Sequence, residues 1–181
     1  MEPAAHIYLV QSTPYFSLFT FHLSLFTFHL SLFTFHLSLF TSTFMAKQII
    51  TPVQKRFSDV DSFMHVNNIW QQSYFDMGKT AFYTQVLGIT GVFDKLRIIT
   101  ASTHTDYYGQ VRLTDDIVVV TDVSRIGNKS MTLHQRIMCG DKCLTESSSV
   151  MVAFDFEAQQ TVAMPEAWRE KLNEYFIHSE Q

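Results

Sequence analysis

Cysteine is scarce in this chain, which has Cys139 and Cys143 and no others among its 181 residues. Small secreted domains held by disulfides carry many more, so this scarcity excludes a disulfide scaffold. The two cysteines flank Gly140-Asp141-Lys142, which has the composition of a hairpin loop, and we interpret them as reduced thiols in two strands. A metal site here would need more ligands, because only His134 lies close in the sequence.

Basic residues are also few, and the chain carries 13 Lys and Arg against 17 Asp and Glu, a net charge of −4. No basic stripe is present, so nucleic acid is not an expected partner. A glycine-rich phosphate loop is missing as well, and no motif signals a metal or a redox cofactor. A ligand with a few phosphates stays compatible with this composition.

Charged residues are absent from Pro3 to Ala46, whereas the composition from Lys47 onward is that of an ordinary folded domain. Within the uncharged part, the heptapeptide that starts at Ser17 recurs at Ser24 and Ser31 and then decays. We therefore divide the chain into a low-complexity extension, residues 1–44, outside the fold, and one domain, residues 45–181.

Three interpretations of the repeat compete. It is long enough to span a bilayer, but Ser, Thr and His interrupt it and no Lys or Arg precedes it. A secretory signal lacks support because neither a basic start nor a small-residue cleavage site is evident. Near-identity of adjacent copies favours a translated tandem DNA repeat, since selection on an anchor would keep hydrophobicity rather than one heptapeptide. We therefore expect no membrane association and a cytoplasmic protein.

Residues 59–68 place two carboxylates, an imidazole and a helix start close together. The helix is predicted over residues 69–87, with Asn67 or Asn68 as its N-cap and Gly88 as its C-cap. Its apolar face is expected to carry four residues, with Phe82 alongside: Trp70, Tyr74, Met77 and Ala81. A carboxylate can attack a carbonyl, and the helix N-terminus beside it can stabilise the oxyanion that forms.

The remaining segments alternate like strands separated by tight turns. The predicted strands lie within residues 49–58, 96–108, 116–124, 131–139 and 144–156, and a terminal helix begins at Pro165. Short turns join antiparallel strands, so one long helix packed on an antiparallel meander predicts an α+β domain.

That order of elements, together with Asp61-Ser-Phe-Met-His65-Val-Asn-Asn68, resembles the hotdog-fold thioesterases. The resemblance covers residues 47–175 and includes a second motif within residues 107–117 and a C-terminal helix at residues 165–171. It implies a curved antiparallel sheet wrapped around one long central helix, with a short C-terminal helix.

Two subgroups of that family are similar to this chain. In the 4-hydroxybenzoyl-CoA thioesterase-like group the second Asp of the Asp-x-Asp pair is catalytic, which corresponds to Asp61. The plant acyl-carrier-protein thioesterases use an Asp, an Asn two residues later and a His four residues later. Asp61 and His65 fit that pattern, but Phe63 stands in place of the Asn. Met64 stands where many relatives have Gly, and Gln71 replaces a common Tyr.

The resemblance and the chemistry together assign candidate roles. Asp61 is predicted to act as a nucleophile or as a general base for water, two routes that the sequence leaves open. His65 suits proton transfer or the orientation of a neighbour. The backbone N–H of Asn68 would polarise the thioester carbonyl. Asp59 is expected to be structural.

The implied activity is hydrolysis of acyl-CoA, without a cofactor, by a homodimer or homotetramer with its sites at the subunit interface. Arg125, Lys129 and Arg97 are the candidate contacts to the coenzyme A phosphates. The alternatives are hydrolysis of acyl carrier protein thioesters, a hotdog module that binds acyl thioesters without turnover, and an unrelated membrane-tethered protein. A hotdog dehydratase is disfavoured because a His-Phe-Pro motif is missing.

Overall fold

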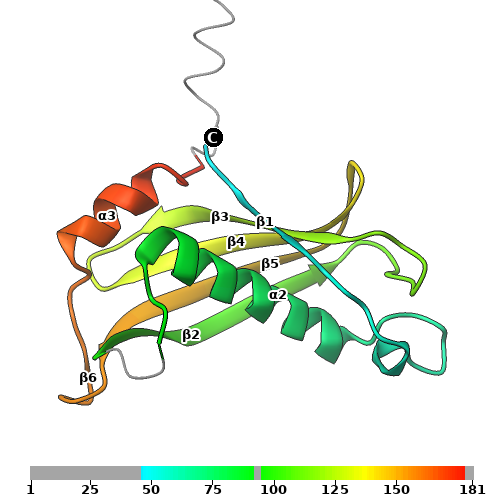
Figure 1. Ribbon diagram of the computed structural model, residues 1–181, viewed down its shortest axis with the longest axis horizontal. Helices are drawn as coiled ribbons and strands as arrows, with labels where there is room; N and C mark the ends of the chain where they lie inside the picture. The colour runs from blue at the N-terminus through cyan, green and yellow to red at the C-terminus, as the bar shows by residue number, and fades with distance from the viewer. Residues whose placement is uncertain (1–45, 92–94, 178–181) are drawn as a thin grey trace, which may run out of the picture. The chain divides into compact units, whose positions relative to one another are not determined.

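The computed structural model describes residues 46–91 and 95–177, which form one antiparallel sheet folded around a long helix (Figure 1). The expectations about the heptapeptide repeat and residues 1–44 lie outside these described residues. Within the described ranges, no helix is both long enough and apolar enough to cross a bilayer.

The sheet has the strand order β1-β3-β4-β5-β2, and a short β6 pairs with β5. Its strands are β1 (Ile49–Pro52), β2 (Leu96–Tyr107), β3 (Val118–Ile126), β4 (Ser130–Cys139), β5 (Lys142–Asp155) and β6 (Gln160–Thr161). The helical segments are η1 (Phe57–Asp59), α2 (Asn68–Phe82), η2 (Tyr83–Leu87) and α3 (Glu166–Asn173).

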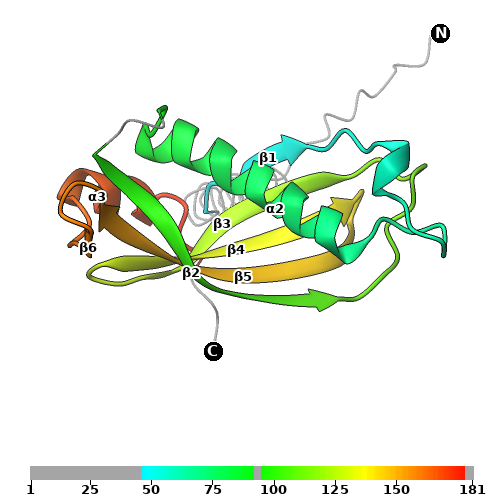
Figure 2. The same cartoon turned by 90° about the horizontal axis from the view of Figure 1, so that it is seen from below.

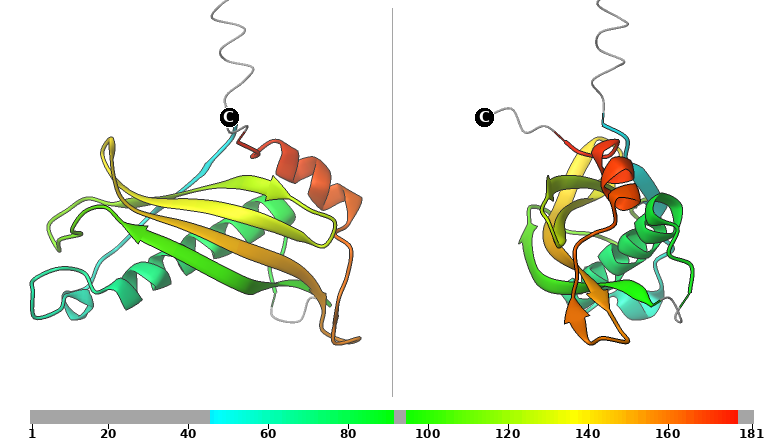
Figure 3. Two further views of the ribbon diagram at one scale, coloured as in Figure 1. Left: turned by 180° about the vertical axis from the view of Figure 1, so that it is seen from behind. Right: turned by 90° about the vertical axis from the view of Figure 1, so that its left-hand side faces the viewer.

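The sheet is curved, and its register shifts show where it bends. Irregularities interrupt β2 between Thr100 and Ser102 and β3 between Val123 and Arg125. Such bulges increase the local twist of a strand and help a sheet to curl. The concave face holds α2 (Figure 2), and the view from behind places the strands in front of that helix (Figure 3). The predicted α+β hotdog fold is thereby confirmed.

Helix α2 packs on the sheet along a line that passes through Gly78. A Cβ atom at Gly78 would lie 2.7 Å from Val119 Cγ1 and 2.8 Å from Gln135 Nε2. The residues of α2 that are buried follow this line: Gln71, Tyr74, Phe75, Gly78, Lys79 and Phe82. The predicted apolar face is therefore wrong at Met77, which is 42% exposed, because closest approach to the sheet is set by the missing side chain of Gly78.

The end of the central helix is less regular than predicted. After Phe82 the helix continues through the π-helical turn η2, so the helical path reaches Leu87 as predicted. Gly88 then caps it with a φ of 73°, a left-handed conformation that favours glycine.

A cluster of charged side chains lies on the sheet face opposite α2. Gln135 of β4 donates to the Phe75 carbonyl of α2, so its neighbours His134 and Arg136 point the other way. Asp122 is fully buried there and accepts from Arg136 Nη2 at 2.6 Å, while His134 Nδ1 lies 2.9 Å from Asp122 Oδ1. His134 Nε2 lies 2.7 Å from Glu146 Oε1, which places this imidazole between two carboxylates.

This cluster predicts a pH-dependent stability. The hydrogen bond to Asp122, aided by the one to Glu146, raises the pKa of His134 above its ordinary value, although burial acts in the opposite direction. The pKa of His134 is higher in the folded state than in the unfolded state, where it is about 6.5. Protonated His134 therefore contributes its full stabilisation of the fold below about pH 6.5. It is lost as the pH rises through the folded-state pKa, so denaturant titrations should show a falling free energy of unfolding above about pH 6.5.

A His134→Gln protein should show a flatter pH dependence over the same range. His104→Gln is the matched control, because the His104 side chain on β2 is 77% exposed, and this protein should keep the wild-type slope. Equal slopes for His134→Gln and wild type would show that His134 does not couple stability to pH.

Candidate functional site

A short loop between η1 and α2 carries the predicted catalytic carboxylate. Val60 and Val66 form an isolated antiparallel bridge, and the Asp61 N–H donates to the His65 carbonyl at 2.9 Å. Met64 lies in this turn with a φ of 65°, in the left-handed region that favours glycine. The turn therefore keeps a conformation suited to Gly while carrying a methionine, at a cost of about 1 kcal/mol.

Asp61 is oriented by the loop that it helps to close. Its Oδ1 accepts the N–H of Phe63 at 2.9 Å and that of His65 at 3.4 Å. In the part of the chain that the structure describes, no hydrogen bond reaches its Oδ2. One oxygen thus fixes the carboxylate, and the other is available to a water molecule or a substrate.

Asp59 has a different role from its neighbour two residues later. It is fully buried, and its Oδ2 accepts Tyr74 Oη at 2.6 Å and the Arg56 N–H at 2.8 Å. Burial alone would raise the pKa of Asp59, but the hydrogen bonds from Tyr74 and Arg56 outweigh it and hold that pKa below its ordinary value. Asp59 ties the loop to α2, in agreement with the structural role expected for it.

The first turn of α2 is fixed to the loop and to the sheet. Asn67 is the N-cap, and its Oδ1 accepts the Ile69 N–H at 2.9 Å. The Gln71 amide donates to the Val66 carbonyl at 3.0 Å and accepts from Thr145 of β5 at 2.6 Å. Across the described segments, the Asn68 N–H donates to no acceptor, so it remains available at the positive end of the helix.

His65 faces a small cavity on the other side of the loop. The cavity has a volume of about 360 Å³ and is lined by Met64, His65, Arg112, Leu113 and Thr114. Asp61 does not line it. For the residues described, the His65 imidazole forms no hydrogen bond, which leaves both ring nitrogens available to a ligand.

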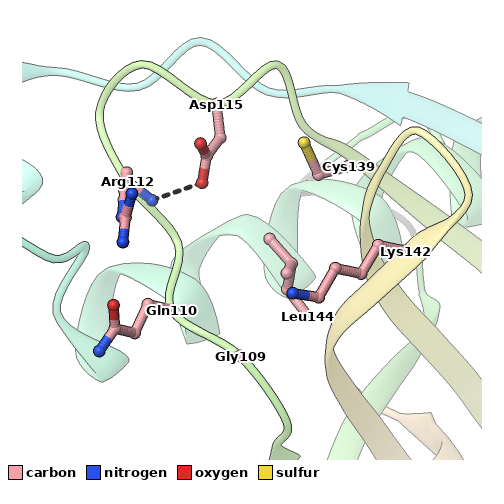
Figure 4. Close-up of a pocket in the computed structure, with 7 residues that line it drawn as sticks. All are labelled: Gly109, Gln110, Arg112, Asp115, Cys139, Lys142 and Leu144. Atoms are coloured by element: carbon pink, nitrogen blue, oxygen red, sulfur yellow. Dashed lines mark hydrogen bonds between the residues drawn. The ribbon is translucent and has the colours of Figure 1, made fainter.

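A second, larger cavity lies between the β2–β3 connection and the β4–β5 hairpin (Figure 4). Its volume is about 490 Å³. The connection contributes Gly109, Gln110, Arg112 and Asp115, and the hairpin contributes Cys139, Lys142 and Leu144. Arg112 lines both cavities, so it stands between them.

The three cations predicted to contact phosphates lie elsewhere. Arg97 begins β2 and stacks on Phe156 with its guanidinium carbon 3.6 Å from the ring centre. Lys129 follows β3 and donates to the Thr161 carbonyl of β6, and Arg125 lies near the end of β3. This end of the sheet lies away from the start of α2 (Figure 1), so one chain does not bring these cations together with Asp61.

Sequence reasoning missed the two cations that line the larger cavity. Arg112 belongs to the second family motif, and Lys142 belongs to the hairpin between the two cysteines. Nothing in the sequence indicates that these separate segments adjoin. Both cysteines are free thiols, and across residues 46–91 and 95–177 no group of three or more His, Cys, Asp or Glu side chains could hold a metal.

Large apolar side chains are exposed around the start of α2. Four of them are between 71% and 82% exposed: Phe57, Phe63, Met64 and Ile69. From their residue types, Phe63, Met64 and Trp70 could line an acyl pocket or belong to the core. In a single chain the first two face outward, whereas Trp70 lies under the Arg56 guanidinium, 4.5 Å from the ring centre.

Comparison with known proteins identifies the family. A family model described as the thioesterase-like superfamily matches residues 55–172. YsmA, an uncharacterized protein of Bacillus subtilis (strain 168), is 27% identical over 129 residues, which cover 70% of this chain and 84% of YsmA.

Solved structures share the fold. A predicted thioesterase from Bacillus stearothermophilus is 26% identical with a TM-score of 0.67, over 72% of this chain and 97% of that protein. A thioesterase complexed with coenzyme A and Zn from Thermus thermophilus is 22% identical with a TM-score of 0.59, over 68% of this chain and 95% of that one. The family match supports thioester hydrolysis as the general chemistry. The chain belongs to the thioesterase-like superfamily.

Proposed function

We propose that this protein hydrolyses acyl-CoA thioesters to a free acid and coenzyme A, with Asp61 as the catalytic carboxylate. The observation that carries the proposal is the available Oδ2 of Asp61, held by its own loop just before the N-terminus of α2. A carboxylate and an available helix N–H at one junction match the two demands of acyl transfer, activation of a nucleophile and stabilisation of an oxyanion.

Two routes fit this arrangement. In one, Asp61 Oδ2 attacks the thioester carbon, the C–S bond breaks, and water then hydrolyses the mixed anhydride. In the other, Asp61 removes a proton from water, and the resulting hydroxide attacks the same carbon. Both routes consume one water molecule, and the departing thiolate takes up a proton.

The groups around Asp61 would support either route. The Asn68 N–H, at the positive end of α2, would donate to the oxygen that becomes negative in the tetrahedral intermediate. His65 would carry a proton to or from the reacting groups, because an imidazole has one nitrogen that can donate and one that can accept a proton. Its exposure to the smaller cavity gives it access to a bound ligand.

Coenzyme A as the carrier is supported by the structural relatives. The Thermus thermophilus thioesterase holds coenzyme A, and so does a Staphylococcus aureus protein that is 16% identical with a TM-score of 0.66. The alternatives are an acyl carrier protein substrate and a module that binds acyl thioesters without turnover. The cytoplasmic location remains a prediction.

The direct test is thiol release from a panel of acyl-CoA thioesters that differ in chain length and aromatic character. We expect turnover of at least one member by the wild-type protein. If a folded protein turns over none of them, the same acyl groups on acyl carrier protein come next. Tight binding without thiol release from either carrier would replace hydrolysis with binding alone.

We also propose that the protein is at least a dimer. Strand β2 pairs with β5 on one side and forms an edge of the sheet on the other. The four exposed apolar residues at the start of α2 would be buried favourably by a second subunit. Sedimentation of the chain beginning at Met45 should therefore give a dimer or larger species at micromolar concentration. A monomer under these conditions would contradict the proposal and the placement of the site at a subunit interface.

A further inference from the structure

We propose that Gln72 and Tyr107 recognise the acyl group of the substrate and select aliphatic acyl thioesters with a hydroxyl group on the third carbon. This inference rests on the proposed hydrolysis and deepens it, because it names the class of acyl group. Gln72 lies on α2 one helical turn beyond Asn68, and Tyr107 is the last residue of β2. The end of β2 lies beside the start of α2 (Figure 1), so the two side chains meet next to the proposed oxyanion site.

The hydrogen bonds around Gln72 fix which of its groups face the protein. Ser147 Oγ donates to the His104 carbonyl at 3.2 Å, and Thr105 Oγ1 donates to Ser147 Oγ at 3.1 Å. Thr105 has therefore used its proton, and it accepts the Gln72 amide nitrogen at 2.9 Å. The same nitrogen donates to Tyr107 Oη at 3.3 Å. The amide cannot turn over, because its oxygen would then face a Thr105 hydroxyl that has no proton left to donate.

Two polar groups stay available at the exposed end of this series of hydrogen bonds. Within residues 46–91 and 95–177, no donor reaches Gln72 Oε1 and no acceptor reaches the Tyr107 O–H. Tyr107 is 47% exposed and therefore open to a ligand. The pair presents one acceptor and one donor side by side. A hydroxyl group complements both, because it donates and accepts at once, whereas a carbonyl or a carboxylate only accepts.

The position of the pair relative to Asn68 places the hydroxyl close to the thioester. Residues four apart on a helix lie on the same face, about 5 Å apart along the axis. Helical side chains lean toward the N-terminus of the helix, so the Gln72 amide reaches back toward the Asn68 N–H. The third carbon of an acyl chain lies two C–C bonds, about 2.5 Å, from the thioester carbon, which suits this spacing.

The inner face of the sheet around the pair is polar, whereas a site for a plain alkyl chain would be apolar. Hydroxyl groups alternate along β2 on the face toward α2, at Thr103, Thr105 and Tyr107. Thr103 Oγ1 lies 3.1 Å from Ser149 Oγ of β5, and Ser149 is fully buried. An alkyl chain laid over Gln72 and Tyr107 would remove water from their available polar groups without replacing its hydrogen bonds. A site of this kind rejects an analogue that lacks the hydroxyl.

The experiment compares butyryl-CoA with the better enantiomer of 3-hydroxybutyryl-CoA, which adds one oxygen atom. For the full chain we expect kcat/KM to be about tenfold higher for the hydroxylated thioester, as two neutral hydrogen bonds would give. Gln72→Leu and Tyr107→Phe should each lower this ratio about threefold, and the double variant should abolish it. In all three variants kcat/KM for butyryl-CoA should stay at the wild-type value. A general structural defect would lower both constants equally and leave the ratio unchanged.

Tyr108→Phe is the matched control for the loss of a phenol oxygen. Tyr108 is the next residue along the chain, but its phenol donates at 3.1 Å to Glu146, which belongs to the charged cluster on the sheet face opposite α2. This protein should keep the wild-type ratio between the two thioesters.

Three results would overturn the assignment. They are equal kcat/KM values of the wild-type protein for the two thioesters, an unchanged ratio in the double variant, and loss of the preference in Tyr108→Phe. Each of them leaves hydrolysis itself standing. If the wild-type protein hydrolyses neither thioester, calorimetric titration with the thioethers S-(3-hydroxybutyl)-CoA and S-butyl-CoA tests the recognition separately. A preference of about tenfold for the hydroxylated thioether that falls in Gln72→Leu would support the site, and equal dissociation constants would overturn it.

Discussion

Replacement of Asp61 by asparagine is expected to lower the turnover of acyl-CoA about 10²- to 10⁴-fold and to leave the fold intact. The amide cannot accept a proton from water and is a poor nucleophile, so either chemical route fails. The Asn oxygen can still accept the N–H groups of Phe63 and His65, which keeps the loop closed. An alanine would lose both contacts, so asparagine separates chemistry from loop structure better.

Asp59→Asn is the comparison variant for Asp61→Asn, because it makes the same substitution at a buried aspartate. Asp59 is buried and bonded to Tyr74 and Arg56, so this substitution should lower the free energy of unfolding by about 1–3 kcal/mol. Steady-state thiol release and thermal unfolding should be measured for both proteins. Wild-type turnover by a folded Asp61→Asn protein would remove Asp61 from the mechanism.

Much of the fold could be predicted because the determining signals are local. Alternating strands, Asn67 as an N-cap and Gly88 as a C-cap follow from residue type and spacing, and each appears in the structure. The Asp61–Asn68 junction could also be predicted from the sequence, because its loop and helix start lie within one short stretch of chain.

The features that sequence reasoning missed depend on contacts between distant segments. Arg112 and Lys142 share a cavity only because the β2–β3 connection folds beside the β4–β5 hairpin. The π-helical turn and the bulges in β2 and β3 are geometric adjustments without a residue signature. The apolar face predicted for α2 is wrong at Met77 for a similar reason, because hydrophobic spacing gives no sign that Gly78, which has no side chain, lies closest to the sheet.

Gly78→Ala should destabilise the protein, although the same change in most helices stabilises them. Alanine gains up to about 1 kcal/mol over glycine in a helix interior. At this position, however, its Cβ would lie 2.7 Å from Val119 Cγ1 and 2.8 Å from Gln135 Nε2. Overpacking of a tight interface costs about 1–3 kcal/mol, and Gln135 is also held by hydrogen bonds to Phe75 and Thr121.

Denaturant titrations should therefore place Gly78→Ala below wild type in free energy of unfolding, and Thr80→Ala, on the exposed side of α2, near or above it. A second substitution, Val119→Ala, removes the methyl group at 2.7 Å and should cost less in the Gly78→Ala protein than in wild type. Such coupling would show that the lost stability comes from the close contact between residues 78 and 119 rather than from a change in helix propensity. A Gly78→Ala protein more stable than wild type would show that α2 can move away from the sheet. Such a shift would also displace the Asn68 N–H from the Asp61 loop, so its thiol release should be measured in parallel.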